Sequence, residues 1–103
     1  MNPDTFHDVV TSLPDVRRAS RGSVARWQHR GRLVARQLDE THVVVRVPFD
    51  VRDVLLHQHP DVFSVPRRLA RHMMVVADLA AGDDGAVEDA VRSAWRMQAE
   101  VDG

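Results

Sequence analysis

The sequence predicts an α+β domain, a two-layer sandwich of one mostly antiparallel sheet with helices on one face. Helical spacing of apolar residues occurs near both ends of the chain and in its middle, and segments that alternate apolar and polar residues lie between the first two of these stretches. The 103 residues suit a single domain, residues 1–103, and 44% hydrophobic residues can build one core. The expected order is one helix, three or four strands, a helix, two strands and a helix.

The first half of the chain contains a helix followed by strands. Apolar residues recur on one helical face from Phe6 to Leu13 and Pro14 follows them, so we expect a helix over residues 4–13. Residues 23–48 then alternate, which predicts three strands with odd-numbered side chains on one face and even-numbered ones on the other. Three-residue turns would keep this parity, and we expect them at residues 29–31 and 39–41.

Two features of this region fit less simply. Leu38 and Val44 are apolar residues on the otherwise polar even-numbered face. Residues 16–19 are compatible with an additional short edge strand.

The second half of the chain alternates shorter elements. Asp50 and Asp53 resemble a capping pair that opens a helix, which Pro60 ends. A short strand at residues 62–65, a polar link at 67–72 and a strand at 73–77 that is apolar on both faces follow. Residues 82–85 form a turn, with Asp83 or Asp84 placed to cap a last helix that runs to about residue 101.

Charge is distributed unevenly along the chain. All 14 basic residues are arginines, and against 15 acids they give a net charge of −1. Residues 17–38 carry seven arginines and no acid, whereas residues 78–103 carry seven acids and two arginines. The total argues against indiscriminate polyanion binding, but the central segment predicts a local basic surface.

Two groups of arginines are the candidate binding residues. On the even-numbered, solvent-facing side of the sheet, beside Gln28 and His42, we expect the first group: Arg26, Arg32, Arg36 and Arg46. The polar link, which could project as a wing, holds the second group: Arg67, Arg68 and Arg71. Arginine pairs bidentately with phosphate, so a nucleic-acid backbone is the natural partner. The same side chains would also keep an exposed sheet face soluble without binding anything.

A small ligand is the alternative partner. Trp27 lies on an apolar stripe, which favours a place in the core, but next to Arg26 it could line a cleft between the sheet and a helix. An anionic or aromatic small molecule would then contact Trp27 and Arg32.

No pattern indicates an enzyme, a metal site or a cofactor. The chain has no cysteine, His57 and His59 lack further ligands at zinc spacing, and no glycine-rich phosphate loop or catalytic triad spacing occurs. No apolar run approaches the roughly 20 residues that span a bilayer, and the N-terminal residues are polar. We therefore expect a cytoplasmic protein without enzymatic activity, cofactor or membrane partner; its oligomeric state does not follow from the sequence.

Four stretches resemble the MmcQ/YjbR family in content and order: residues 12–16 (SLPDV), 27–38 (WQHRGRLVARQL), 59–66 (HPDVFSVP) and 94–96 (AWR). The resemblance covers nearly the whole chain. Family members are small cytoplasmic bacterial proteins with a two-layer α+β fold described as a double wing, and they are commonly labelled DNA-binding. The resemblance therefore implies a DNA-binding protein, while the occurrence of some members in antibiotic gene clusters suggests a natural product as the small ligand.

The chain departs from the family pattern in two places. Gly31-Arg32 replaces the Gly-Lys pair of the central hairpin, which keeps the charge and changes the geometry of the donor. Residues 67–73 are basic where many members have aromatic and glycine residues. The resemblance therefore implies no aromatic contact in this link.

Overall fold

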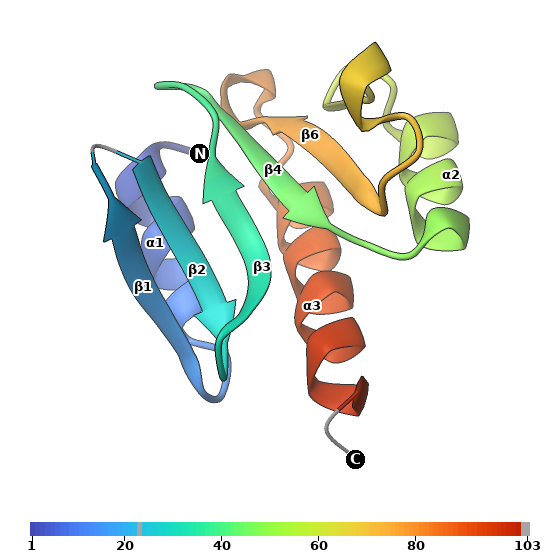
Figure 1. Ribbon diagram of the computed structural model, residues 1–103. Coiled ribbons are helices and arrows are strands. Elements are labelled where there is room, and N and C mark those ends of the chain that lie inside the picture. Colours follow the sequence, from blue (N-terminus) through green and yellow to red (C-terminus); the bar gives the residue numbers. More distant parts are fainter. Residues whose placement is uncertain (23, 102–103) are drawn as a thin grey trace.

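The computed structural model describes residues 1–22 and 24–101, and these form an α+β arrangement of helices and one sheet (Figure 1). The elements in chain order are α1 (Pro3–Thr11), β1 (Val16–Arg21), β2 (Val24–His29), β3 (Arg32–Gln37), β4 (His42–Arg46), α2 (Phe49–Gln58), β5 (Phe63–Ser64), η1 (Arg67–Leu69), β6 (Met74–Asp78), η2 (Leu79–Ala81) and α3 (Asp84–Val101), where η marks a 3-10 turn. This order confirms the predicted fold class, with the edge strand β1 included.

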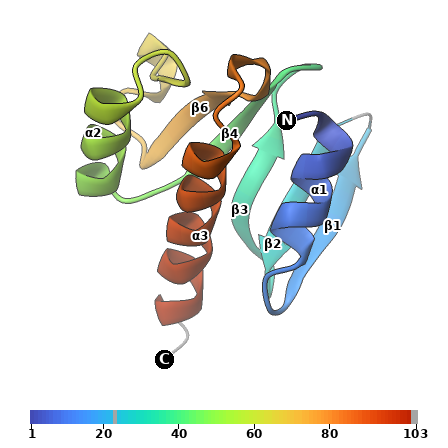
Figure 2. The same cartoon turned by 180° about the vertical axis from the view of Figure 1, so that it is seen from behind.

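The sheet has the order β1-β2-β3-β4-β6-β5, and every neighbouring pair is antiparallel. Helices α1 and α3 cover one face of it, as the view from behind shows (Figure 2). Helix α2 lies beside α3 and the β5–β6 end of the sheet. None of the helices in the described part of the chain is long and apolar enough to span a membrane.

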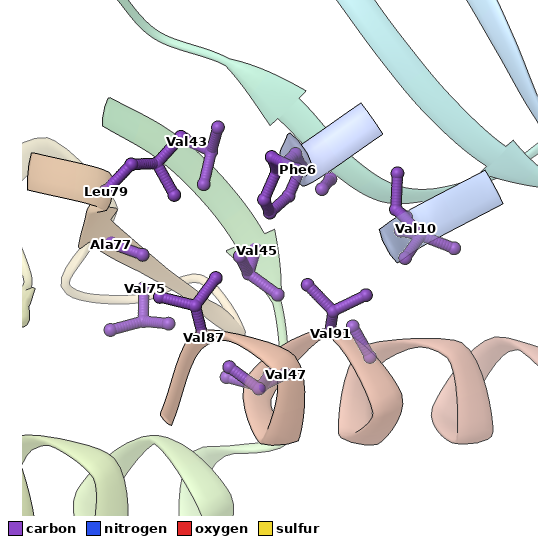
Figure 3. Close-up of a cluster of buried hydrophobic side chains, with 14 of the residues drawn as sticks. Phe6, Val10, Val43, Val45, Val47, Val75, Ala77, Leu79, Val87 and Val91 are labelled. Carbon is purple, nitrogen blue, oxygen red and sulfur yellow. The ribbon is translucent and has the colours of Figure 1, made fainter. Parts of the chain in front are cut away.

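The main core fills the space between the sheet and the two covering helices. Phe6 and Val10 from α1 meet Val45 from β4 and Val91 from α3, and all four are fully buried (Figure 3). The amphipathic spacing of both helices places such residues on one side, so burial of that side holds the helices against the sheet.

A second, smaller cluster lies on the opposite face of the sheet. Leu69 of η1 packs on Val44 and Val76, and these three residues are 6%, 0% and 4% exposed. This packing explains why Val44 interrupts a polar face and why the strand at β6 is apolar on both sides. The expectation of a projecting wing at residues 67–72 is wrong, because η1 folds back onto the sheet.

The β2–β3 hairpin also differs from the prediction. Its turn has two residues, Arg30 and Gly31, with φ of 50° and 84°, the positive values of a type I′ turn. The register then shifts opposite Trp27 and Gln28, and Val34 and Ala35 are both buried in the main core. This bulge changes the parity of β3, so a single face cannot hold all the even-numbered residues.

The other predicted boundaries are mostly confirmed. Asp39 Oδ1 accepts hydrogen bonds from the backbone N–H of Thr41 and His42 at 2.9 and 2.8 Å and so stabilises the turn between β3 and β4. Leu38 N donates to His42 O at 3.0 Å, which leaves residues 39–41 as the predicted three-residue turn. Asp83 Oδ1 accepts from Ala86 N at 3.1 Å and caps α3.

Two helix boundaries differ from the prediction. Helix α1 ends at Thr11, two residues earlier than expected. The capping pair predicted for the second helix is wrong: α2 begins at Phe49 after Pro48, and Asp50 lies inside its first turn.

Candidate nucleic-acid interface

The face of the sheet opposite α1 and α3, here called the open face, carries the candidate site. Directly paired residues of antiparallel strands share a face. Arg26 of β2 pairs with Arg36 of β3, which in turn pairs with Val44 of β4, and Val44 belongs to the cluster under η1. Arg26 and Arg36 therefore lie on the open face, as predicted.

Three arginines from three elements meet there. Arg36 lies between Arg26 on the neighbouring strand and Arg68 of η1; burial, and then the positive charges of Arg68 and Arg26, hold the pKa of the Arg36 guanidinium below its usual value. We call Arg26, Arg36 and Arg68 the arginine cluster. The packing of Leu69 on Val44 and Val76 places η1 over the sheet, so that Arg68 comes close to the two strand residues.

In the part of the chain that the structure describes, the cluster has no acidic counterpart. In residues 1–22 and 24–101, none of its three arginines takes part in an ion pair with a carboxylate. The Nε of Arg26 is shielded from solvent and has no hydrogen-bond partner among the described residues. A buried guanidinium N–H without an acceptor is costly, so this position of Arg26 is unfavourable for the stability of the fold.

Two neighbouring hollows lie along β1 and β2, and Arg26 of the cluster lines the first. One hollow of about 410 Å³ is lined by Ala19, Ser20, Arg26 and Gln28. A second of about 320 Å³ is lined by Asp15, Arg17, Gln28, Arg30 and Gly31. The two share Gln28, and we call them together the β1–β2 groove. Arg17 pairs with Gln28 on the open face, so the groove has Arg26 at the end beside the cluster and Arg17 in its middle.

The acidic residues lie mainly elsewhere. Helix α3, with Glu88, Asp89 and Glu100, packs on the other face of the sheet. Asp15 at the far end of the groove is engaged by Arg30, with Nη2 and Oδ2 3.0 Å apart. Asp78 pairs with His42 at the opposite end of the open face. The helical layer therefore does not cover the arginine cluster.

Of the remaining predicted contact residues, three lie at or near the open face and one does not. Arg46 is on the open face, beyond Val44 on the same strand. Arg67, the first residue of η1, and Arg71, which follows η1, are both exposed. The prediction for Arg32 is wrong: Arg32 pairs with His29, whose ring is buried on the helix-covered face, and the bulge in β3 separates it from Arg36.

Trp27 does not line a cleft with Arg32. The Trp27 side chain is 3% exposed, its ring packs edge-on against Phe6 with centroids 5.0 Å apart, and its Nε1 donates to His7 Nδ1 at 3.0 Å. A residue so enclosed offers no surface to a ligand. The structure therefore gives Trp27 the role in the core that its apolar stripe favoured.

Two arginines were missed by the sequence analysis. Arg17 follows the apolar Val16, which is buried in the main core, and this change from an apolar to a polar residue is the signal that places Arg17 on the open face. Arg52 of α2 supports the site from a distance: its Nη1 donates to the carbonyl oxygens of Ala70 and His72 at 3.2 and 2.9 Å. The Arg52 guanidinium also lies 4.8 Å from the Phe49 ring centroid. No local pattern marks Arg52, because its partners lie about 20 residues along the chain.

Comparison with known proteins adds no assignment. The chain matches no protein-family model, and no match was found among curated proteins or solved structures. Within residues 1–22 and 24–101, no three His, Cys, Asp or Glu side chains gather as a metal site would require.

Proposed function

We propose that this protein binds DNA without catalysing a reaction, by holding backbone phosphates on the open face of its sheet. The observation that carries the proposal is the arginine cluster, in which Arg26 and Arg36 are direct cross-strand partners and Arg68 adds a third positive charge near Arg36, without an acidic partner in the described part of the chain. No carboxylate among the residues that the structure describes neutralises this charge, so a ligand that does so gains binding energy.

The β1–β2 groove extends the contact surface. A phosphate chain that lies on the arginine cluster can continue past Gln28 to Arg17, so four arginines are in position to hold it. These contacts are to phosphates and carry no base readout. We therefore propose binding that depends little on base sequence.

The resemblance to the MmcQ/YjbR family supports the same proposal. We propose membership of that family on the four stretches of sequence named above, and its members are commonly labelled DNA-binding. In this chain the contacts are assigned to the cluster and groove, with Arg46, Arg67 and Arg71 at their periphery.

The test is fluorescence anisotropy with a short DNA duplex over a series of salt concentrations. Neutralisation of four phosphates predicts a slope of about −3.6 for log K against log salt concentration. Arg26→Gln should weaken binding and reduce the slope by about 0.9. The matched control is Arg92→Gln, which removes the same charge from exposed α3 on the other layer and should change neither quantity.

Three results would overturn the proposal. These are affinity weaker than about micromolar at low salt, binding that does not respond to salt, or equal losses in Arg26→Gln and Arg92→Gln. Equal losses would show that only net charge matters.

A further inference from the structure

The arginine cluster differs from the rest of the open face in the number of donors that it brings to one place. Arg26 and Arg36 are direct cross-strand partners, and Arg68 approaches from η1 above them. Each guanidinium can donate a pair of parallel N–H bonds. Three such forks on one small area are more than an internal phosphate of a nucleic-acid strand can accept well, because a phosphodiester has two non-bridging oxygens and one negative charge.

We propose that the arginine cluster is a site for a terminal phosphate, the phosphomonoester group at the 5′ end of a nucleic-acid strand. The inference deepens the proposed function and rests on it in one respect: the strand behind the phosphate is assumed to lie on the same open face. The cluster alone would also accept the phosphate of a free mononucleotide.

The chemistry of a phosphomonoester matches the cluster. The group carries three terminal oxygens and close to two negative charges at neutral pH. Three oxygens allow each of the three guanidiniums its own acceptor, and the larger charge offsets more of their mutual repulsion.

The surroundings of the cluster suit a strand end. On the side of β4, η1 closes the open face, because Leu69 packs directly on Val44 and Val76. Arg52 holds this closure in place through the carbonyls of Ala70 and His72. On the other side the β1–β2 groove leads away past Gln28. A strand with its terminal phosphate at the cluster therefore has a hollow along which to continue, whereas a strand running past the cluster would meet η1.

The experiment compares one single-stranded DNA oligonucleotide with a 5′-phosphate and with a 5′-hydroxyl, by anisotropy at constant salt. The phosphorylated strand should bind about tenfold more tightly, the effect of one additional charge-assisted pair. Arg36→Gln and Arg68→Gln should bring the two affinities close together. Arg17→Gln is the matched control: it should weaken both strands alike and preserve their ratio, because Arg17 lies in the groove. A third arm measures the direct binding of a nucleoside 5′-monophosphate and of the unphosphorylated nucleoside by isothermal titration calorimetry.

The outcomes separate the inference from the proposed function. Equal, salt-dependent binding of both strands overturns the terminal-phosphate site and leaves DNA binding intact. Direct binding of the monophosphate, but not of the nucleoside, while neither strand binds supports the site and overturns the proposed function. A preference for the phosphorylated strand that survives Arg36→Gln and Arg68→Gln overturns the assignment to this cluster. Failure of strands and monophosphate alike overturns both.

Discussion

Arg26 and Arg36 lie directly opposite each other on neighbouring strands, and Arg68 adds a third positive charge beside them. Like charges in such cross-strand positions destabilise a sheet. The folded protein therefore carries an unfavourable interaction that a bound anion would relieve. Stability lost at one place in exchange for binding is common at functional sites.

Replacement of Arg36 should separate stability from binding. In Arg36→Gln, we expect the free energy of unfolding to rise by about 0.5 kcal/mol at low salt, because the repulsion from Arg26 and Arg68 is removed. Urea denaturation measures this change, and the gain should shrink as salt is added. A loss of stability in the variant would show that Arg36 is held by favourable contacts instead.

Asp39 gives the protein a dependence on pH. The backbone N–H of Thr41, the most important cause, and the hydrogen bonds from His42 hold the pKa of the Asp39 carboxyl below 3.8. Because the folded pKa is the lower one, ionised Asp39 stabilises the fold; this contribution is complete above the ordinary pKa and is lost as the pH falls through the folded value.

Asp39→Asn tests this statement, since asparagine keeps an acceptor oxygen but does not titrate. Urea midpoints of both proteins are compared between about pH 5 and pH 3, and the wild type should lose more stability than the variant over this range. Parallel curves would contradict the role of Asp39.

At the scale of elements, the open face depends on η1 and on the bulge in β3, and neither is visible as a pattern. Alternation predicted strands at β2, β3 and β4, but it could not show that Val34 and Ala35 would both turn into the core. The error at Arg32 follows from that bulge. Likewise, the sequence of residues 67–72 looks like that of a solvated link. Leu69 is buried only because it contacts Val44 and Val76, which lie on other strands, and no local pattern reveals this contact.

Arg52 is expected to hold η1 and the residues after it against the rest of the fold. Arg52→Ala removes two hydrogen bonds to the carbonyls of Ala70 and His72 and should lower the free energy of unfolding by about 1 kcal/mol. We expect faster amide exchange at Ala70 and His72, and about threefold weaker DNA binding because Arg68 is less well placed. Arg52→Lys should recover part of the stability and part of the DNA affinity. Arg92→Ala serves as the control. Unchanged exchange at these amides would exclude the role.

At the scale of the whole molecule, charge is sorted between the two layers. The segment charges could be counted from the sequence, and the strand alternation correctly placed Arg26 and Arg36 on one face. The addition of Arg68 could not be predicted, because it follows from tertiary packing. Nor does the sequence state that α3 covers the face opposite the arginine cluster, which keeps Glu88, Asp89 and Glu100 away from it.

This sorting predicts a small effect of the acidic layer on binding. The double variant Asp89→Asn, Glu100→Gln raises the net charge by two, yet DNA affinity at about 0.15 M salt should change less than twofold, because such distant charges are screened. The salt slope should stay the same. Arg17→Gln, a change of one charge on the open face, should reduce both affinity and slope. An increase in affinity that matches the loss in Arg17→Gln would show that net charge controls binding.

The order of strands has a consequence for how the protein folds. Strands β1 to β4 pair with their sequence neighbours across short turns, whereas the pairing of β4 with β6 must close residues 47–73, α2 included. Local strand pairings form readily. Closure of a long segment costs more conformational entropy, and this cost comes before the contacts between β4 and β6 can offset it. Arg26 and Arg36 belong to the local part, but Arg68 arrives with the closing segment. A partly folded chain thus holds two arginines of the cluster, and a ligand that needs all three binds and stabilises only the completed fold.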